Sequence, residues 1–386
     1  MNKIDTYKDL LVIPYKYLLD SSRGHAHAQG GPVWPDWDTT PHRHYKAGVA
    51  IDWAPEVDET APVLSAGEAW WAGACCNHFG HQVVDFTSKL ALYNEMLGPG
   101  DRIAIATKIR SGMTSWETLP GFARAIYEYF GFTKDSVHVV SKPTRFALMH
   151  SLPQQEEHGG GPATPEHLAA LERRADQLLP RETPWSGGRF YVSRSQMAHG
   201  GGIAGESAIE KKISEAGYEI IYPETLPLKD QLSLYRSAAE LVFQEGSALH
   251  GLQLLGPINA RVTVIVRRPG FKMLEPNLSQ RISNLNYVVI GSAFLHGVKP
   301  NGKPADANGI LIPDEQGLEQ LAEAIGASPA TLATISPEMS GEMSGDISAF
   351  LEREAGSYRA KHPHHMPRIL AQLDKTPFAG LAPSSA

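Results

Sequence analysis

The feature that most constrains the fold is a regular alternation of strand and helix patterns in the second half of the chain. Short apolar runs rich in Val, Ile, Tyr and Phe alternate there with helix-like stretches. The expected strands cover residues 189–193, 218–223, 240–244, 261–268 and 287–291. Strands that alternate with helices form parallel sheets connected by crossover helices. The pattern therefore predicts a Rossmann-like half-sheet of the α/β class.

A less regular alternation precedes this block. Residues 77–97 carry an apolar stripe at helical spacing, and residues 102–107 form a short apolar run typical of a strand. A helix pattern within 114–131 and a strand pattern at 136–141 follow. The first 70 residues contain six prolines and a stretch rich in Gly, His and Trp, which predicts loops and short strands.

A chain of 386 residues is long enough for two domains. The stretch 151–188 combines Gly- and Pro-rich segments with a helix pattern at 166–179, and we interpret it as the link between the two blocks. We expect an N-terminal Rossmann-like domain over 1–165, a C-terminal one over 166–345 and a helical tail over 346–386. The tail is expected to pack back on the N-terminal domain.

Charge and cysteine content exclude several classes of protein. The formal net charge of −7 disfavours binding to nucleic acid or to an anionic membrane surface. The only cysteines, Cys75 and Cys76, are adjacent, so they cannot build a disulfide framework. The sequence shows neither an apolar run near the ~20 residues of a membrane span nor a secretory signal pattern. We therefore expect a cytoplasmic protein, in contact with a membrane only peripherally.

Two turns that follow strands of the second block are candidate binding sites, because parallel sheets bind ligands at the carboxyl ends of their strands. In the first turn Arg194 follows a strand, and glycines 200–202 precede a helix. The second turn presents Glu245, Gly246 and Ser247 before a helix expected to begin at Ala248. Backbone amides at such a helix start, together with Arg194, suit a phosphate group. A mobile surface loop and an ordinary capped helix are the alternative interpretations.

These residues also carry a resemblance to a known family. The segment 190–255 resembles the core of glycosyltransferase family 61. That family's pattern has a Ser-Arg after a strand, an Asn-Glu opening a helix, and a later His-Gly-Ala-Gly loop. The helix around His81 and Asp85 resembles that family's own His and acidic residue. The other matching positions are Ser193-Arg194, Glu206, Gly217-Tyr218-Glu219, Pro223-Glu224, Asp230-Gln231 and Gly246.

The chain departs from that pattern at the donor loop. Glu245 stands where the family has His, Ser247-Ala248 where it has Ala-Gly, and His250-Gly251 where it has Thr-Asn. Gly205 replaces the Asn that precedes the helix. These changes affect the contacts expected with the donor sugar.

The resemblance implies a GT-B fold, with two Rossmann-like domains facing a cleft, and an inverting glycosyltransferase. The expected donor is a nucleotide sugar, UDP-linked, and no metal ion or other cofactor is implied. The expected acceptor is a glycan or a lipid-linked glycan of bacterial surface polysaccharide synthesis, at the inner face of the membrane. The oligomeric state stays open.

The resemblance also implies roles for individual residues. His81 and Asp85 are four positions apart on one helix face, so the carboxylate can orient an imidazole base. Asp85 as the base itself and a structural role for His81 are the alternatives. His250 is expected either to contact phosphate or to line the cleft. Glu224 and Gln231 are expected to flank the ribose or the base of the nucleotide.

Two other functions are compatible with the same sequence. The pairs His25 with His27 and His42 with His44 have the spacing of metal ligands on strands, which would suit a metal-dependent enzyme or binding protein. The departures at Glu245 and Gly205 would also suit a transferase-like partner protein without catalytic activity.

Overall fold

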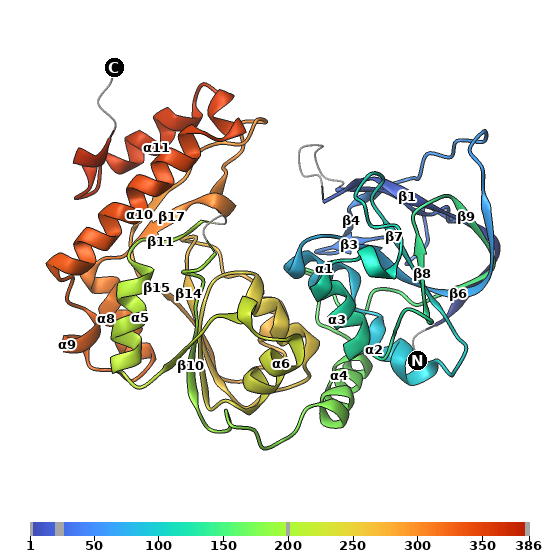
Figure 1. The fold of residues 1–386 in the computed structure, drawn as a ribbon, viewed down its shortest axis with the longest axis horizontal. Coiled ribbons are helices and arrows are strands. Elements are labelled where there is room, and N and C mark those ends of the chain that lie inside the picture. The colour runs from blue at the N-terminus through green and yellow to red at the C-terminus, as the bar shows by residue number, and fades with distance from the viewer. Residues whose placement is uncertain (1–2, 20–26, 198–200, 383–386) are drawn as a thin grey trace.

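The computed structural model describes residues 3–19, 27–197 and 201–382. These residues form two lobes joined by a linker that leaves α4 (Figure 1). Each lobe contains a sheet with parallel strands and flanking helices, which confirms the α/β class and is compatible with a Rossmann-like fold. In the described residues no helix is long and apolar enough to cross a membrane.

The N-terminal lobe is built on a mixed sheet with the strand order β5-β2-β1-β9-β6-β7-β8. Strands β9, β6, β7 and β8 are parallel, and β1 is antiparallel to both β2 and β9. The strands are β1 (Asp5–Leu18), β2 (Ala28–Pro32), β5 (Asp52–Trp53), β6 (Leu64–Cys75), β7 (Ile103–Thr107), β8 (Val137–Val140) and β9 (Thr144–Ser151). A separate hairpin pairs β3 (Tyr45–Lys46) with β4 (Val49–Ala50).

The first 70 residues are more regular than the sequence predicts. β1 is a long strand near the middle of the sheet, although it contains Pro14. Its pairing with β2 shifts register between Ile13 and Tyr17, where a proline lacking an N–H can be accommodated. The irregular pattern in the sequence thus reflects a bulged strand.

The helix expected over 77–97 is divided in two. α1 (Phe79–Phe86) ends at Thr87, whose hydroxyl donates to the Val83 carbonyl at 2.7 Å, and α2 (Leu90–Met96) begins three residues later. A Thr side chain that bonds back to the preceding turn competes with helix continuation. The lobe is completed by α3 (Gly121–Tyr129) and α4 (Pro165–Leu178), and α4 packs against α2.

The C-terminal lobe contains the parallel sheet that the alternation predicts, in the order β12-β10-β13-β14-β15. The first strand along the chain, β10, lies between β12 and β13, so the strand order reverses direction at β10 and β13. This reversal is the switch point at which open parallel sheets bind ligands. The strands are β10 (Arg189–Val192), β12 (Glu219–Ile221), β13 (Glu240–Gln244), β14 (Arg261–Val266) and β15 (Leu285–Val289).

Shorter elements surround this sheet. β11 (Gly202–Ile203), β17 (Ile310–Ile312) and β16 (Ala293–Leu295) form a small sheet beside it. The α-helices are α5 (Glu206–Glu215), α6 (Leu228–Ser237), α7 (Glu275–Leu278), α8 (Glu315–Ala324) and α9 (Pro329–Leu332). The segment expected as a helix from Ser247 is a 3₁₀ helix, η4 (Ser247–Leu254). In the described residues of this lobe the other 3₁₀ helices are η3 (Pro223–Thr225), η5 (Asp306–Asn308), η6 (Tyr358–Lys361) and η7 (Ala379–Leu381), and η2 (Trp116–Thr118) belongs to the N-terminal lobe.

The prediction that the C-terminal tail packs on the N-terminal domain is wrong. α10 (Pro337–Ala355) and α11 (His365–Leu373) lie on the C-terminal lobe, on its side away from the other lobe (Figure 1). Their apolar residues join its core, where Ile347 and Ile369 pack in one cluster with Ile209. α10 contacts α5 and β17, and α11 contacts β16. The predicted boundary at residue 345 falls inside α10.

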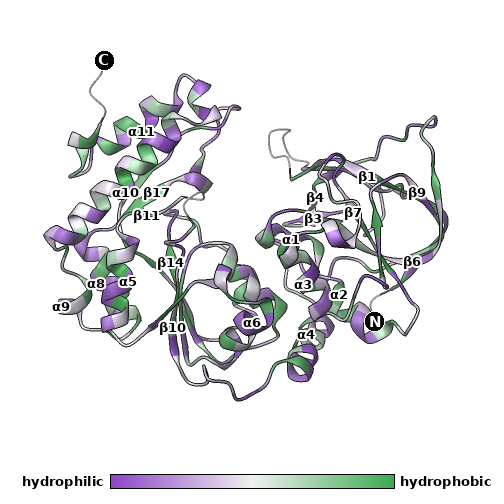
Figure 2. Ribbon diagram, in the orientation of Figure 1, coloured by the Kyte–Doolittle hydropathy of each residue, from purple (hydrophilic) through white to green (hydrophobic). Residues whose placement is uncertain are grey.

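Buried apolar residues connect the two lobes. One cluster includes Tyr93, Tyr127 and Leu152 from the N-terminal lobe, and Phe190 and Phe243 from the C-terminal sheet. α1 contacts η4, and α3 contacts α6, across the junction. Figure 2 shows hydrophobic residues along the strands and mixed hydrophobic and hydrophilic residues along the flanking helices, as expected for helices with one buried face.

Candidate functional site

A cleft of about 780 Å³ lies between the lobes, next to the contact of α1 with η4. Its walls come from the β3–β4 hairpin, the start of α1, the carboxyl ends of β10, β13 and β14, and loops that follow them. The cationic, histidine and other side chains that line it include Lys46, His78, His81, His158, Arg194, Ser247, His250, Arg267, Arg268, Phe271 and Lys299.

Positive charge dominates this cleft. Its described lining holds six cationic side chains, Lys46, Arg194, Arg267, Arg268, Lys272 and Lys299, against the single carboxylate of Asp306. Neither Lys46 nor Lys299 forms an ion pair within the described part of the chain. A concave surface with this balance attracts an anionic ligand even though the whole chain is acidic.

Arg194 stands at the end of β10, as the sequence predicts, and lies over Gly246. A Cβ added at Gly246 would lie 2.7 Å from the Cδ atom of Arg194 and 2.8 Å from its Cζ atom. The missing side chain therefore makes the room that the guanidinium occupies. The Arg194 backbone N–H donates to the Oε1 atom of Glu206 at 2.9 Å, and Glu206 also accepts from the Tyr191 and Ser193 hydroxyls. Burial raises the pKa of Glu206 to about 7.

Glu245 does not face the cleft. Its buried carboxylate accepts from the backbone N–H groups of Arg267 and Arg268, at 3.0 and 3.1 Å, and from the Arg268 guanidinium. It thereby holds the end of β14 in place. The Arg268 guanidinium stacks over the Phe271 ring at 4.1 Å, and burial lowers the pKa of Arg267 to about 10. These two arginines and Phe271 form the cleft wall opposite α1.

The expected contact between His81 and Asp85 is present on α1. The Nδ1 atom of His81 lies 2.7 Å from the Oδ2 atom of Asp85. The side chain of His81 is 36 % exposed and lines the cleft, whereas that of Asp85 is 4 % exposed. Burial opposes ionisation of Asp85, but the histidines beside it hold the pKa of this carboxyl well below its usual range. Since a carboxylate only accepts, His81 carries a proton on Nδ1, and in the neutral form of the ring Nε2 is then the acceptor.

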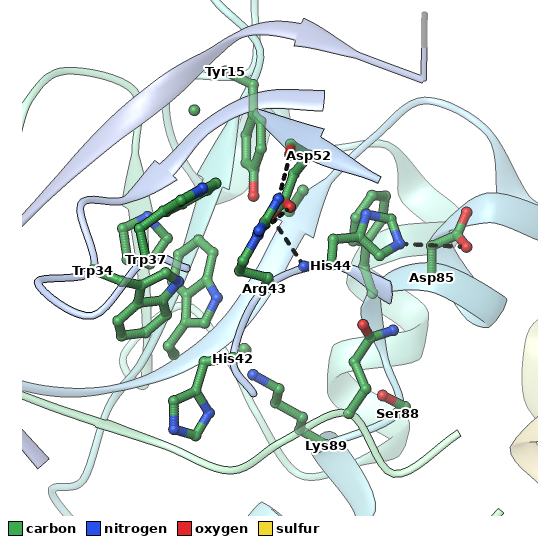
Figure 3. A pocket seen from close by; sticks show the side chains of 18 residues that line it. Tyr15, Trp34, Trp37, His42, Arg43, His44, Asp52, Asp85, Ser88 and Lys89 are labelled. Atoms are coloured by element: carbon green, nitrogen blue, oxygen red, sulfur yellow. Dashed lines mark hydrogen bonds and ion pairs between the residues drawn. The ribbon is translucent and has the colours of Figure 1, made fainter. Parts of the chain in front are cut away.

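A second histidine contacts Asp85 from the other side. The Nε2 atom of His44 lies 3.5 Å from the Oδ1 atom of Asp85, and Figure 3 shows the His44 ring directed at this carboxylate. His44 and Asp85 border a small pocket of about 40 Å³, which Lys89 and Trp34 also line (Figure 3). Burial lowers the pKa of Lys89 to about 7, and its Nζ atom donates to the Ser151 hydroxyl at 3.1 Å. Sequence reasoning missed this link, because His44 lies far from Asp85 along the chain.

The histidines proposed as metal ligands have different partners. His42 Nε2 lies 3.0 Å from Asp5, whereas His44 contacts Asp85. His27 is part of the described chain, but His25 and Gly200 lie outside the described residues. In the described residues no group of three or more His, Cys, Asp or Glu side chains is placed to hold a metal ion.

His250 lines the cleft beside the start of α1. A Cβ added at Gly80 would lie 2.8 Å from the Nε2 atom of His250 and 3.4 Å from the Ser247 hydroxyl, so the two lobes touch at this point. The Nδ1 atom of His250 lies 2.8 Å from the Oε1 atom of Gln253. Burial lowers the pKa of His250 to about 3.

Besides Glu245, three of the predicted donor-binding residues lie outside the cleft lining. Glu224 is exposed on η3, and the Gln231 amide donates to the carbonyls of Pro223 and Leu226, at 2.7 and 2.9 Å. Ala248 packs against the apolar core. Lys46 and His158 line the cleft although they were not predicted. Lys46 ends the two-residue strand β3 and His158 lies on a turn, and in neither place does a periodic pattern indicate which way a side chain points.

Comparison with known proteins gives one family. Residues 79–263 match the family model Glycosyltransferase 61. The match begins at α1 and ends within β14, so it includes His81, Asp85, Arg194 and Gly246. A search of curated proteins found no match.

Proposed function

Because this match makes the chain a glycosyltransferase of family 61, we propose that it transfers a sugar, with inversion, from a UDP-linked donor to a glycan or lipid-linked acceptor. The proposal includes a GT-B arrangement, with the donor on the C-terminal lobe and the acceptor on the N-terminal lobe, and a place in bacterial surface polysaccharide synthesis. The observation that carries it is the cationic cleft, which lies at the switch point of the C-terminal sheet and faces His81.

The diphosphate fits the C-terminal wall of the cleft. Arg194, Gly246 and Ser247 follow β10 and β13, the two strands at which the strand order reverses. The guanidinium offers paired N–H donors, and Gly246 allows close approach of the backbone. Arg267 and Arg268 add positive charge on the neighbouring strand. In this proposal cationic side chains stabilise the charge that develops on the leaving diphosphate, and no metal ion takes part.

His81 is the proposed base. Its unprotonated Nε2 takes the proton of the acceptor hydroxyl while that oxygen forms a bond with the anomeric carbon. The bond from this carbon to the diphosphate oxygen breaks on the opposite face, and the electron pair leaves with UDP. The proton stays on His81, where the Asp85 carboxylate, 2.7 Å from Nδ1, stabilises the imidazolium. Attack from the face opposite the diphosphate accounts for inversion.

Thermal-shift measurements test this proposal. The purified protein is screened against UDP, GDP, CMP and their sugar derivatives, with and without EDTA. A ligand at 100 times its Kd stabilises by about 2.7 kcal/mol, so a shift for UDP that EDTA leaves unchanged is the expected result. A protein that responds to no nucleotide, or that responds only with metal present, contradicts the proposal.

Two arginine variants test whether Arg194 binds the nucleotide. Arg194→Ala should weaken UDP binding by roughly 1.5–3 kcal/mol, the contribution of a charge-assisted hydrogen bond. Arg181→Ala removes an arginine whose side chain is 80 % exposed and outside the cleft, and it should leave UDP affinity unchanged. Equal affinity of the wild type and Arg194→Ala would remove Arg194 from the donor site.

A further inference from the structure

A buried charged network begins at Glu156, in the stretch between β9 and α4. Its carboxylate accepts two hydrogen bonds from Arg281, at 2.9 and 2.7 Å, and one from the Asn277 amide, at 2.9 Å. All three residues are buried. Burial alone would raise the pKa of Glu156, but Arg281 and His167 bring it to about 2. Glu156 is therefore ionised at neutral pH and can only accept hydrogen bonds.

The ionised carboxylate fixes the orientation of Gln253. The Nε2 atom of Gln253 donates to the Oε1 atom of Glu156 at 3.3 Å. A flipped amide would place its carbonyl oxygen against the carboxylate, so the flip is disfavoured. The Gln253 carbonyl oxygen must then face the Nδ1 atom of His250, 2.8 Å away. An amide oxygen only accepts, which requires the proton of His250 to be on Nδ1.

The other ring nitrogen of His250 is left as an acceptor. The ring is neutral, since burial holds its pKa far below 7. Among the described residues none donates a hydrogen bond to Nε2, and His250 lines the cleft next to Ser247. A neutral acceptor in a cationic cleft is a poor partner for a phosphate group, which has no proton to donate when fully ionised. A hydroxyl group has a proton to donate, so the Nε2 acceptor suits a hydroxyl ligand.

We propose that His250 accepts a hydrogen bond from a hydroxyl of the transferred sugar, and that Glu156 acts through Gln253 as a positioning residue that sets the His250 tautomer. The inference rests on the proposed function, because the cleft must hold a nucleotide sugar. His250 lines the cleft beside the donor loop at Gly246 and the start of α1, so a sugar linked to the diphosphate lies next to this ring when it reaches His81. Recognition of the sugar is then separate from recognition of UDP.

The tautomer is tested without any substrate. Long-range ¹H–¹⁵N spectra of histidine-labelled protein distinguish a protonated from an unprotonated ring nitrogen, and His250→Asn identifies the signals by their loss. We expect a protonated Nδ1 and an unprotonated Nε2 in the wild type. Gln253→Met is a substitution of similar length whose side chain cannot accept from Nδ1. In this variant the His250 ring proton should no longer be held on Nδ1. A wild-type proton on Nε2, or a spectrum that Gln253→Met leaves unchanged, overturns the tautomer assignment.

The sugar contact is tested by equilibrium binding of UDP, UDP-glucose, UDP-galactose and UDP-N-acetylglucosamine. Asn places no polar atom at the position of Nε2, whereas Gln reaches it. His250→Asn should weaken binding of the preferred UDP-sugar by roughly 2- to 12-fold, the value of one neutral hydrogen bond, without weakening UDP. His250→Gln should restore part of the loss. His362→Asn, at a half-buried histidine outside the cleft lining, is the control.

Each other outcome has a definite meaning. Equal weakening of UDP and of its sugars would place His250 at the diphosphate, and no weakening of either would remove it from the ligand; both overturn the proposal. If the wild type binds no UDP-sugar, the proposed donor is wrong and the sugar contact is wrong with it. The spectra still decide the tautomer in that case, so the two failures can be told apart.

Discussion

Asp85 contacts two histidine rings, and only one of them lines the cleft. His81 faces the cleft, whereas His44 borders the small pocket on the other side of the carboxylate. With a carboxylate at Nδ1, the His81 ring has a defined tautomer and orientation before any substrate binds. The ability of His81 to act as a base therefore depends on the Asp85 carboxylate as well as on the imidazole ring itself.

His81→Ala should lower sugar transfer by ~10²- to 10⁴-fold if His81 is the base, while UDP affinity stays close to that of the wild type. The control is His150→Ala, because His150 forms a similar pair with Glu68, 2.8 Å apart, outside the cleft. Steady-state kinetics and UDP binding give the two quantities. Transfer at nearly the wild-type rate would move the role of base to Asp85 or to another group.

Lys89 predicts a specific dependence of stability on pH. Burial puts its folded-state pKa at about 7, whereas an unfolded lysine titrates near ~10.4. Between these values the unfolded chain binds the additional proton, so the Lys89 contribution to stability rises as the pH rises through this window. Lys89→Met should raise the Tm most below pH 7, and the difference from the wild type should shrink towards pH 10. Exposed Lys8→Met is the control, and parallel profiles for wild type and Lys89→Met would refute the assignment.

At the scale of elements, the turns after β10 and β13 function as one unit, because Arg194 from one turn occupies the space left by Gly246 in the other. Gly246 has a φ of 175°, which any residue can adopt. The requirement for glycine at this position is therefore steric and does not come from the backbone conformation. The two turns can meet closely only where β10 and β13 are neighbours in the sheet. The switch point thus brings together residues that are 52 positions apart in the sequence.

Gly246→Ala should displace the Arg194 side chain and weaken UDP binding about as much as Arg194→Ala does. The added methyl group would overlap the guanidinium, while the backbone could keep its conformation. Gly345→Ala is a matched control, since a Cβ there meets nothing within 4 Å. Calorimetric titration with UDP measures the effect. Unchanged affinity in Gly246→Ala would show that the two turns do not depend on each other.

The elements show which parts of the molecule could be predicted from sequence. The parallel strands of the C-terminal sheet are buried apolar runs, and their periodicity is a local signal, so strands and turns were located correctly. The direction of Glu245 could not be assigned in this way. Successive residues of an extended segment point to opposite sides, so Glu245 faces away when Gly246 faces the cleft. β1 and the packing of α10 depend on distant partners that no local pattern specifies.

At the scale of the whole molecule, Glu156, between β9 and α4 of the N-terminal lobe, and Arg281 of the C-terminal lobe join the two lobes through a buried ion pair 2.7 Å long. Removing one partner leaves a buried charge without compensation, and the cost of this is about 3–5 kcal/mol. Pairing with Asn277 and Gln253 spreads the network over elements of the C-terminal lobe. The relative position of the lobes is therefore tied to the state of one carboxylate.

Arg281→Met should lower the stability of the protein by about 3–5 kcal/mol, and Glu156→Gln combined with Arg281→Met should recover part of this loss. Denaturant unfolding measures both. Lys211→Met, which breaks an exposed pair with Glu338, should change stability by no more than about 1 kcal/mol. Equal effects of Arg281→Met and Lys211→Met would mean that the buried pair contributes no more than a surface one.

The apolar cluster shared by the two lobes also decides how the molecule can be divided. Tyr127 and Phe243 belong to different lobes but to the same cluster. A cut between α4 and β10 would give two fragments, and each would expose to water part of an apolar surface that the other covers now. Neither fragment is then a stand-alone nucleotide- or acceptor-binding module. Exchange of one lobe for that of a related enzyme would have to carry over its half of the cluster as well.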